Sequence, residues 1–417
     1  MFWRKDRNIV VALEMGSSKV AVAVAEMRDD GSLVVLGVGE SQSHQVRKCE
    51  IIDFEMAQKC VHDALNDAEQ RTDVAINEVY LAISGAHVRS GNVRLTTVIN
   101  SEGDEILPEH LDELASMARQ QPLNPGYALV HDLIQHYRID DGSLTENPLG
   151  LSSKRLMADY HLISGIATRL QTTIRCVKEL SIDVRNYALS IYATAQAVLT
   201  PEQKRHGAIV INFGAGVTDY IVYRDGAVIH TGVLGVGGDH LTNDLVAGLK
   251  LPFIKAEQLK REHGSVHPAA PGGSADPDRG SHVILPGSYS FEERSIRLDA
   301  VETIMNARQG EILEIIRDDL EAQPFWPDFA GSIHCTGGAS QVDGLVELAA
   351  EIFSCPVELA GECPLEGDQG YASRPELATV LGLLHYARVA ESRMQPLGPW
   401  GRVSDIFKKT FASIGLF

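Results

Sequence analysis

Residues 8–41, NIVVALEMGSSKVAVAVAEMRDDGSLVVLGVGES, contain three short apolar runs separated by turns that carry glycine. Apolar runs of this length, bounded by Gly, Ser and Asp, predict strands, which we expect at Ile9–Leu13, Lys19–Glu26 and Leu33–Val38. The next segment, DFEMAQKCVHDALNDAEQRT, repeats its apolar residues at helical spacing, and a fourth strand is expected at Glu78–Ile83. The predicted order is therefore strand, strand, strand, helix, strand.

The same order returns in residues 207–238, GAIVINFGAGVTDYIVYRDGAVIHTGVLGVGG. Here we expect strands at Ala208–Phe213, Thr218–Arg224 and Ala227–Val233, followed by a helix through Asp239–Leu249. Two copies of one unit suggest a duplicated domain with a cleft between its halves.

Two further segments interrupt the repeated units. Ser84–Tyr160, with a helical LPEHLDELASMARQ and a turn-rich PLNPGY, predicts a small inserted domain. A second insert begins near Leu245, and its SVHPAAPGGSADPDRGSHVILP is rich enough in Pro, Gly and Ser to be an exposed loop. We expect RSIRLDAVETIMNARQGEILEIIRDDLEA to form one long amphipathic helix ending near Ala322, and SIHCTGGASQVDGLVELAAEIF to form a strand, a glycine turn and a helix.

Length and charge narrow the class of protein. A chain of 417 residues exceeds what one hydrophobic core usually supports, so two or more domains are expected. The formal net charge of −19 argues against broad binding to nucleic acid, whose phosphates this surface would repel.

Cysteine and histidine usage predicts a protein of the reducing cytoplasm without a structural metal. The six cysteines form no CxxC pair, and the 15 histidines form no HExxH motif. No run reaches the roughly 18 apolar residues of a membrane span, and residues 1–16 hold no signal-peptide run. We therefore expect a chain that neither crosses a bilayer nor follows the usual secretory route.

Three glycine turns have the composition of phosphate-binding loops, because phosphates need inward backbone N–H groups and no obstructing side chain. A single such turn is more often a plain hairpin, but three in this order favour a phosphate clamp with a nucleoside pocket behind it. The first turn holds Gly16, Ser17, Ser18 and Lys19; the second holds Gly214, Ala215, Gly216, Val217 and Thr218; the third holds Gly337, Gly338 and Ala339.

The motifs LEMGSSKV, INFGAGVTDY and IHCTGGAS resemble the phosphate 1, phosphate 2 and adenosine motifs of the actin, Hsp70 and sugar-kinase ATPase superfamily. Within it, VYLAISGAHVRSG, HYRIDDGSLTENPLG, VLGVGGDHLTNDLVAGL and KAEQLKREHG are most similar to the FtsA family of actin-like bacterial cell-division proteins. The likeness runs from about Ile9 to Ala390 and includes the inserted domain. It implies an α/β, actin-like (ribonuclease H-like, duplicated) two-lobed ATPase fold with an inserted α+β subdomain of the FtsA 1C type.

The resemblance also implies a division of the chain into parts. These are residues 1–84 and 161–200 (first lobe, 1A), 85–160 (inserted subdomain 1C), 201–244 and 331–374 (second lobe, 2A), 245–330 (subdomain 2B), 375–390 (a helix returning to the first lobe), 391–399 (a linker) and 400–417 (an amphipathic helix).

The cofactors implied are ATP (or ADP) and Mg²⁺, the ion being held through phosphates and waters without a direct protein ligand. The resemblance places Glu257, Lys260 and Arg261 at the adenosine ribose and base, with Gly337, Gly338 and Ala339, and with Arg308 as a further neighbour. A helical spacing of three brings Glu257 and Lys260 to one face. From the residues alone, a solvated surface pair is an equal alternative.

Two positions depart from the superfamily pattern. Glu14 and Asn212 stand where aspartates usually hold hydrated magnesium and orient the attacking water. Asn212 lacks the charge and any base function, while Asp219 remains as a charge near the site. We therefore expect ATP hydrolysis to be slow or absent, with nucleotide acting as a conformational and assembly cofactor.

The final segment, residues 399–417 (PWGRVSDIFKKTFASIGLF), has an amphipathic pattern. Its apolar residues fall within an arc of about 140° of a helix, and Trp400–Phe417 holds three basic residues and one acid. Such a helix suits an anionic membrane surface, although docking on the protein's own core is the commoner fate of an apolar stripe. The family pattern favours the membrane. The residues expected there are Trp400, Val403, Ile406, Phe407, Lys408, Lys409, Phe411, Ile414 and Phe417.

The resemblance implies a peripheral protein on the cytoplasmic face of the cell inner membrane, at the division septum. Its implied partners are the C-terminal tail of FtsZ, further copies of itself in actin-like protofilaments, and other division proteins. A PilM-like pilus-assembly homologue and a sugar or acetate kinase remain alternatives; an Hsp70-type chaperone would need a substrate-binding domain after the ATPase.

Overall fold

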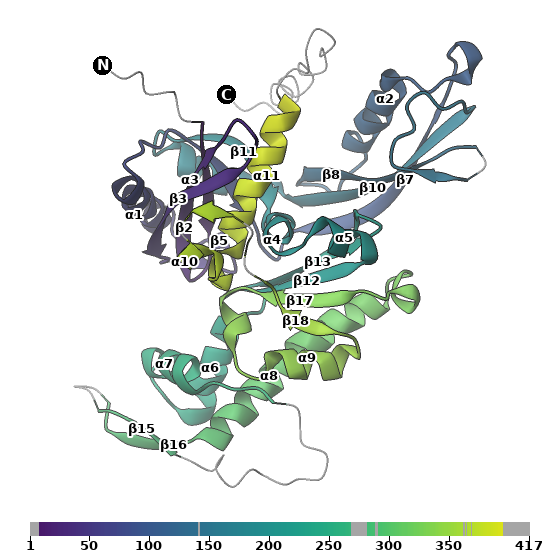
Figure 1. Ribbon diagram of the computed structural model, residues 1–417. Helices are drawn as coiled ribbons and strands as arrows, with labels where there is room; N and C mark the ends of the chain where they lie inside the picture. The colour runs from purple at the N-terminus through teal and green to yellow at the C-terminus, as the bar shows by residue number, and fades with distance from the viewer. Residues whose placement is uncertain are drawn as a thin grey trace, which may run out of the picture.

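The computed structural model describes residues 8–140, 142–267, 282–287, 291–361, 363, 365–367 and 369–394. These residues form two lobes, each built on a β-sheet, and a third sheet that extends beside them (Figure 1). All of the residues expected at the membrane, within 400–417, and most of the predicted linker at 391–399 lie outside the described residues.

The sheet of the first lobe has the strand order β11-β6-β1-β2-β3-β19. Its first three strands are the predicted meander, each antiparallel to the next, and β1 also pairs in parallel with β6. The expected strand order is confirmed. The elements of this lobe are β1 (Ile9–Met15), β2 (Lys19–Met27), β3 (Leu33–Gln42), β4 (Val46–Arg47), β5 (Glu50–Ile51), α1 (Phe54–Thr72), β6 (Glu78–Ile83), α3 (Ala167–Lys178), β11 (Asp183–Leu189), α4 (Ser190–Val198), β19 (Glu366–Gly367), α10 (Gln369–Ala372), η5 (Pro375–Leu377) and α11 (Ala378–Met394).

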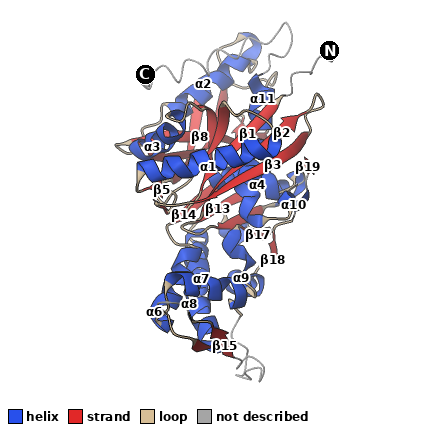
Figure 2. Cartoon of the chain, turned by 90° about the vertical axis from the view of Figure 1, so that its left-hand side faces the viewer, coloured by secondary structure: helices blue, strands red, loops and turns tan. Residues whose placement is uncertain are grey.

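Both faces of the first sheet are covered by helices. Val11 and Leu13 point to α1 and α3, whereas Val10 and Ala12 point to α4 and α11. Because successive strand residues face opposite sides, a strand buried on both faces is apolar at nearly every position. Figure 2 shows α1 lying across this sheet.

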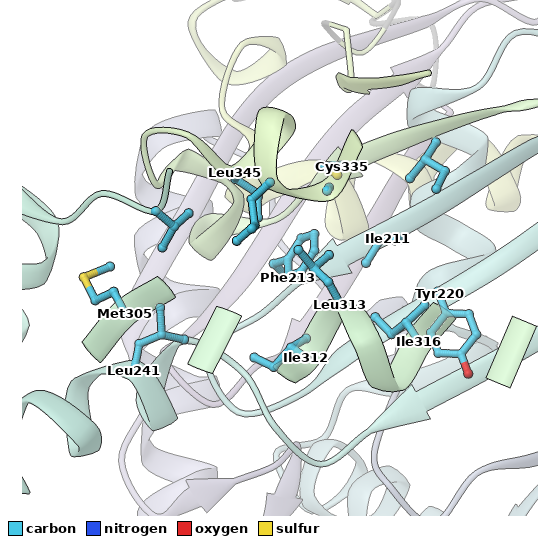
Figure 3. Close-up of a cluster of buried hydrophobic side chains, with 14 of the residues drawn as sticks. Ile211, Phe213, Tyr220, Leu241, Met305, Ile312, Leu313, Ile316, Cys335 and Leu345 are labelled. Carbon is cyan, nitrogen blue, oxygen red and sulfur yellow. The ribbon is translucent and has the colours of Figure 1, made fainter. Parts of the chain in front are cut away.

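The second lobe repeats the arrangement with the strand order β14-β13-β12-β17-β18. One face packs against α6, α8 and α9, and Figure 3 shows Phe213, Ile211 and Tyr220 of the sheet meeting Ile312, Leu313 and Ile316 of α8. The elements are α5 (Pro201–His206), β12 (Ala208–Phe213), β13 (Thr218–Arg224), β14 (Ala227–Leu234), α6 (Gly238–Leu249), α7 (Phe253–His263), β15 (His282–Leu285), β16 (Arg294–Arg297), α8 (Leu298–Glu321), η3 (Trp326–Asp328), β17 (Ser332–Thr336), η4 (Gly338–Gln341), α9 (Leu345–Phe353) and β18 (Val357–Leu359).

The segment between β6 and α3 forms a separate sheet of order β7-β10-β8-β9 with α2 packed on one face. Its elements are β7 (Arg89–Val98), η1 (Glu102–Asp104), α2 (Pro108–Arg119), β8 (Tyr127–Arg138), β9 (Leu144–Thr145) and β10 (Arg155–Ile166). We call this segment the inserted domain. β10 runs directly into α3, so the inserted domain continues into the first lobe.

One predicted helix is shorter than expected. The long helix was expected to include residues 294–297, but these residues form β16, which pairs with β15, and α8 begins at Leu298. In RSIR the one apolar residue, Ile296, is buried in the core of this lobe while its two neighbours are exposed. That alternation is the strand period, and pairing with β15 outweighs the helical pattern that follows.

Helix α4 lies between the two lobes and is shared by their cores. Ala193 and Ala197 pack in the cluster that contains α11, whereas Ile191 and Ala195 pack against β12 and β13 of the second sheet. The two helices cross closely, because a Cβ at Gly382 of α11 would lie 2.0 Å from the carbonyl oxygen of Ala193. Among the described residues, no helix is both long enough and apolar enough to span a bilayer.

We expect Gly382→Ala to lower the free energy of unfolding by roughly 1–3 kcal/mol, because the added methyl forces α4 and α11 apart. The matched control is Gly310→Ala in α8, where a Cβ would meet nothing within 4 Å. That change should raise stability by about 0.5–1 kcal/mol, since alanine loses less backbone entropy in a helix. Urea unfolding of the two variants measures both effects, and an unchanged or raised stability of Gly382→Ala would contradict the crossing.

Candidate nucleotide site

A cavity of about 620 Å³ lies where the two lobes meet, and both lobes line it. It gathers all three glycine turns predicted as phosphate loops, together with α7. The predicted residues that line it are Gly16, Ser17, Ser18, Lys19, Gly214, Ala215, Gly216, Val217, Glu257, Lys260, Arg261, Gly337, Gly338 and Ala339, with Glu14, Asn212 and Asp219. Thr218 and Arg308 do not line it.

The first two turns are built alike. The N–H of Gly16 donates to the Lys19 carbonyl at 2.9 Å, and the N–H of Gly214 donates to the Val217 carbonyl at 3.0 Å. The tips also touch: a Cβ at Gly216 would lie 2.3 Å from Ser17 Oγ. The two hairpin tips therefore meet beside the cavity, and the missing side chain at Gly216 leaves the space that the Ser17 side chain occupies.

Thr218 supports the second hairpin from behind. It is fully buried, and its Oγ1 donates to the Val236 carbonyl at 2.9 Å. Ser17 has a matching link in the first lobe, where its Oγ accepts from the Cys49 N–H at 3.0 Å. Each hairpin is thus held by a hydroxyl as well as by its strands.

Two carboxylates line the floor of the cavity. Burial raises the pKa of Glu14 to about 7, against the opposing effects of Lys19 and the Thr379 hydroxyl. Burial also raises the pKa of Asp219 to about 7, and the charge of Glu14 adds to the shift; the Asn212 amide lies close enough to lower it but not in hydrogen-bonding geometry. Glu14 Oε2 and both Asp219 oxygens are buried without a hydrogen-bond partner among the described residues.

Buried, unpartnered carboxylate oxygens fit the surroundings of a hydrated divalent cation. Oxygen ligands and their bound waters are what Mg²⁺ prefers, and a cation would relieve the mutual repulsion of the two groups. Across the part of the chain that the structure describes, no three His, Cys, Asp or Glu side chains gather in a way that could hold a metal directly. The donor set therefore suits an ion held mainly through waters and a ligand.

An ion-pair network on one wall of the cavity was not predicted. Glu40 accepts from Lys19 Nζ at 2.8 Å and from both terminal nitrogens of Arg374 at 2.6 and 3.0 Å, and Arg374 Nε also donates to Glu376. Burial raises the pKa of Glu40, but these cations outweigh it and the net pKa is lowered. The network joins the start of β2 to the loop before α11, and no local pattern in the sequence connects these positions.

Three of the predicted adenosine residues, Glu257, Lys260 and Arg261, lie together on α7. Lys260 Nζ contacts Glu257 at 2.7 Å, as the spacing of three predicts, and donates to Thr242 Oγ1 and to the Gly238 carbonyl. Thr242 donates to Glu257 at 2.6 Å. Burial raises the pKa of Glu257, but the charge of Lys260 outweighs it, so the group is held as an anion.

Arg308 and Arg261 have other partners. Arg308 pairs with Asp244 of α6 and Glu311 of its own helix, and so ties α6 to α8. Arg261 pairs with Glu257 and is 68% exposed. Other cavity residues that sequence reasoning missed are Ser84, Ser190, Asp239 and Thr379. None of them lies in one of the three predicted glycine turns, so only the fold could bring them in.

Comparisons with known proteins agree with this geometry. A family model described as "Cell division protein FtsA" matches residues 209–382, and one described as "SHS2 domain inserted in FTSA" matches residues 85–164. The chain is 30% identical over 428 aligned residues to the cell division protein FtsA of Shigella flexneri, covering 99% of this chain and 96% of that protein. It is 29% identical over 417 residues to that of Escherichia coli K12, covering 98% and 96%.

Solved structures show the fold. A chain of the PilM-PilN type IV pilus biogenesis complex matches with a TM-score of 0.64 at 14% identity, covering 91% of this chain and 98% of that one. MreB5 of Spiroplasma citri bound to ADP matches with a TM-score of 0.52 at 13% identity, covering 93% and 98%. The expected actin-like, two-lobed fold with an inserted domain is confirmed.

Asp219→Asn is expected to stabilise the nucleotide-free protein by on the order of 2 kcal/mol above pH 7, because a buried carboxylate becomes a neutral amide. With the pKa raised from 3.8 to about 7, the folded state keeps a proton that the unfolded state has already lost. The free energy of unfolding of the unmodified protein should therefore fall as pH rises through this window, and the fall should be smaller in the variant, in which only Glu14 still contributes.

Denaturant unfolding at a series of pH values, without nucleotide or Mg²⁺, measures the difference. The control is Asp225→Asn, whose side chain is 88% exposed and whose loss should leave the pH dependence unchanged. Equal pH slopes in the unmodified protein and Asp219→Asn would show that Asp219 is not held in its raised state.

Proposed function

Because the chain belongs to the FtsA family of bacterial cell-division proteins, we propose that it binds ATP or ADP with Mg²⁺ in the cavity between its lobes. We propose further that it tethers FtsZ filaments to the cytoplasmic face of the cell inner membrane, at the division septum. The observation that carries the nucleotide part is one cavity lined by two like-built glycine hairpins, a third glycine turn and two buried carboxylates that hold three unpartnered oxygens.

The hairpins would hold the phosphates. Ser17 and Ser18 in one tip, and Ala215 and Gly216 in the other, carry backbone N–H groups and line the cavity. Backbone N–H groups from two sides suit phosphate oxygens, and the glycine at position 216 lets the two tips lie close together. Lys19 adds a positive charge on the same side, although Glu40 already engages it.

Glu14 and Asp219 would accept hydrogen bonds from the waters around Mg²⁺, which neutralises phosphate charge when bound. Because both pKa values are raised to about 7, each carboxyl group is protonated part of the time at neutral pH. Both groups would lose their protons when a cation binds. Asn212 beside them supplies no charge. This arrangement supports binding more than turnover, so we propose that hydrolysis is slow and that nucleotide acts mainly on conformation.

The adenosine would lie between α7 and the Gly337–Ala339 turn, both of which line the cavity. Glu257 is held as an anion by Lys260 and Thr242, so its position is fixed before a ligand arrives. A preorganised carboxylate of this kind suits a ribose hydroxyl pair, because hydroxyls donate to it without a change in protonation.

The C-terminal tail would be the membrane anchor, and α11 leads to it. The last turns of α11 are fixed to the first lobe, since Tyr80 Oη donates to Glu391 at 2.6 Å and Arg185 donates to the same carboxylate at 2.8 Å. The proposal for residues 400–417 rests on their cationic, amphipathic sequence. A short linker after a fixed helix would hold the body close to the bilayer.

As a cell-division protein of this family, the chain works with other division proteins. Our proposal further includes binding to the C-terminal tail of FtsZ and assembly into protofilaments. It also includes the division of residues 1–417 into the subdomains named above. The residues matched by the inserted-domain family, 85–164, support the proposed boundaries of 85–160. The likeness to the PilM chain, at 14% identity, concerns the fold, and it does not favour a role in pilus assembly over cell division.

Asn212→Asp is expected to raise Mg²⁺-dependent phosphate release by roughly tenfold to a hundredfold, because it restores a base and an anionic oxygen beside the phosphates. Asn212→Ala is the control that removes the amide without adding charge and should not gain activity. Release of inorganic phosphate at saturating ATP measures this. If Asn212→Asp binds ATP but releases phosphate no faster than the unmodified protein, the amide does not limit turnover.

Liposome co-sedimentation of the full chain and of a chain lacking residues 400–417 tests the anchor. Only the full chain should sediment with vesicles that contain anionic lipid, and it should do so less with neutral vesicles. Replacing Lys408 and Lys409 by alanine should weaken binding by about 1 kcal/mol per residue. Running each arm with and without ATP, with bound nucleotide measured in the same samples, tests the cofactor. Equal sedimentation of the deleted chain would refute the tail as the anchor.

A further inference from the structure

The outer edge of β14 in the second lobe is bound by side chains of the inserted domain. Ser90 Oγ donates to the Thr231 carbonyl, Asn92 Nδ2 to the Ile229 carbonyl and Gln135 Nε2 to the Val228 carbonyl, each at 2.9 Å. These bonds satisfy carbonyls that a neighbouring strand would otherwise take. We call this set of contacts, with His161, the β14 contact.

His161 of β10 lies at the centre of the β14 contact and is 1% exposed. Its Nδ1 lies 2.7 Å from Asn92 Oδ1, and its Nε2 lies 3.0 Å from Thr231 Oγ1. Because the Asn92 amide nitrogen is committed to Ile229, its oxygen faces the ring; Nδ1–H therefore donates to it, and Nε2 accepts from the Thr231 hydroxyl. Burial lowers the pKa of His161 to about 3, which keeps the ring neutral in this arrangement.

The far end of β14 leads directly to the nucleotide cavity. Leu234, its last residue, pairs with Thr218 at the base of the second hairpin, and Thr218 Oγ1 bonds the Val236 carbonyl. The next residues bind the hairpin itself: the Gly238 N–H donates to the Gly214 carbonyl at 2.9 Å and the Asp239 N–H to the Ala215 carbonyl at 2.8 Å. A shift of β14 along its length would therefore move the hairpin.

We propose that His161 is a positioning residue of the nucleotide cavity, and that the β14 contact couples the inserted domain to the Gly214–Val217 hairpin. The inserted domain is continuous with the first lobe through β10 and α3 but bonds to the second lobe through β14. Because the inserted domain is attached to both lobes, a change in the angle between them must strain or shift the β14 contact. Coupling of this kind acts in both directions, so a ligand on the inserted domain would alter nucleotide affinity as nucleotide alters the inserted domain. The inference rests on nucleotide binding as proposed above.

The test compares the unmodified full chain with His161→Ala, His161→Gln and Thr231→Val. We expect His161→Ala and Thr231→Val to weaken ATP binding about fivefold to fiftyfold in calorimetry, the range of a typical coupling between sites. His161→Gln, whose amide can still donate and accept, should recover part of the affinity. Hydrogen exchange of β7 and β8 should slow on adding ATP to the unmodified chain, and this response should vanish in His161→Ala.

The matched control is His110→Ala, which removes another buried histidine of the inserted domain that caps α2 through the Leu107 N–H and has no bond to β14. It should lower stability without changing ATP affinity. Asn92→Asp, an exposed change that places an anion beside the Ile229 carbonyl, covers the case in which His161→Ala does not fold; it should weaken ATP binding as well.

The outcomes separate this inference from the proposed function. If the unmodified chain binds ATP and His161→Ala, Thr231→Val and Asn92→Asp bind it equally well, the coupling is refuted while the nucleotide site stands. Equal losses in His110→Ala and His161→Ala would also refute it, because the effect would then be one of general stability. If the unmodified chain binds no nucleotide, the proposed function fails and this inference fails with it.

Discussion

The nucleotide cavity depends on the approach of two turns, where Gly216 of one lobe meets the Ser17 side chain of the other with no room for a Cβ. Both turns repeat the same hydrogen bond, from the first glycine to the residue three positions later. The first hairpin of each sheet therefore has the same local geometry, and both hairpins end at the same cavity. The helices that cover the sheets, and α4 between the lobes, hold this meeting point.

That meeting point also carries uncompensated charge. Glu14 of β1 and Asp219 of β13 come from the strands beside the two hairpins and are buried together, with three oxygens that bond nothing in the described chain. Burial raises the pKa of both groups, and the charge of Glu14 raises that of Asp219 further, so the pair weakens the folded state at neutral pH. A cation that binds only the folded form would offset this cost, so ligand binding and stability are linked at one site.

The sequence shows much of this arrangement, because the decisive features are local. A meander with a glycine turn is visible in LEMGSSKV and again in INFGAGVTDY, and the Glu257–Lys260 pair follows from helical spacing. The features it hides are pairings over long distances. Arg374 reaches Glu40, Arg308 binds Asp244 instead of the cavity, and Ile296 turns to a strand because β15 is beside it. Such partners are chosen by tertiary packing, which no window of sequence contains.

The order of the chain has a consequence for synthesis. The sheet of the second lobe holds all its strands once β18 has been made, whereas the first lobe still lacks β19 and α11, its last pieces. During translation the first lobe therefore cannot complete its fold until residues 378–394 leave the ribosome. Until then, the apolar face that α11 covers is exposed. Until α11 is in place, that apolar face is open to contacts with other chains.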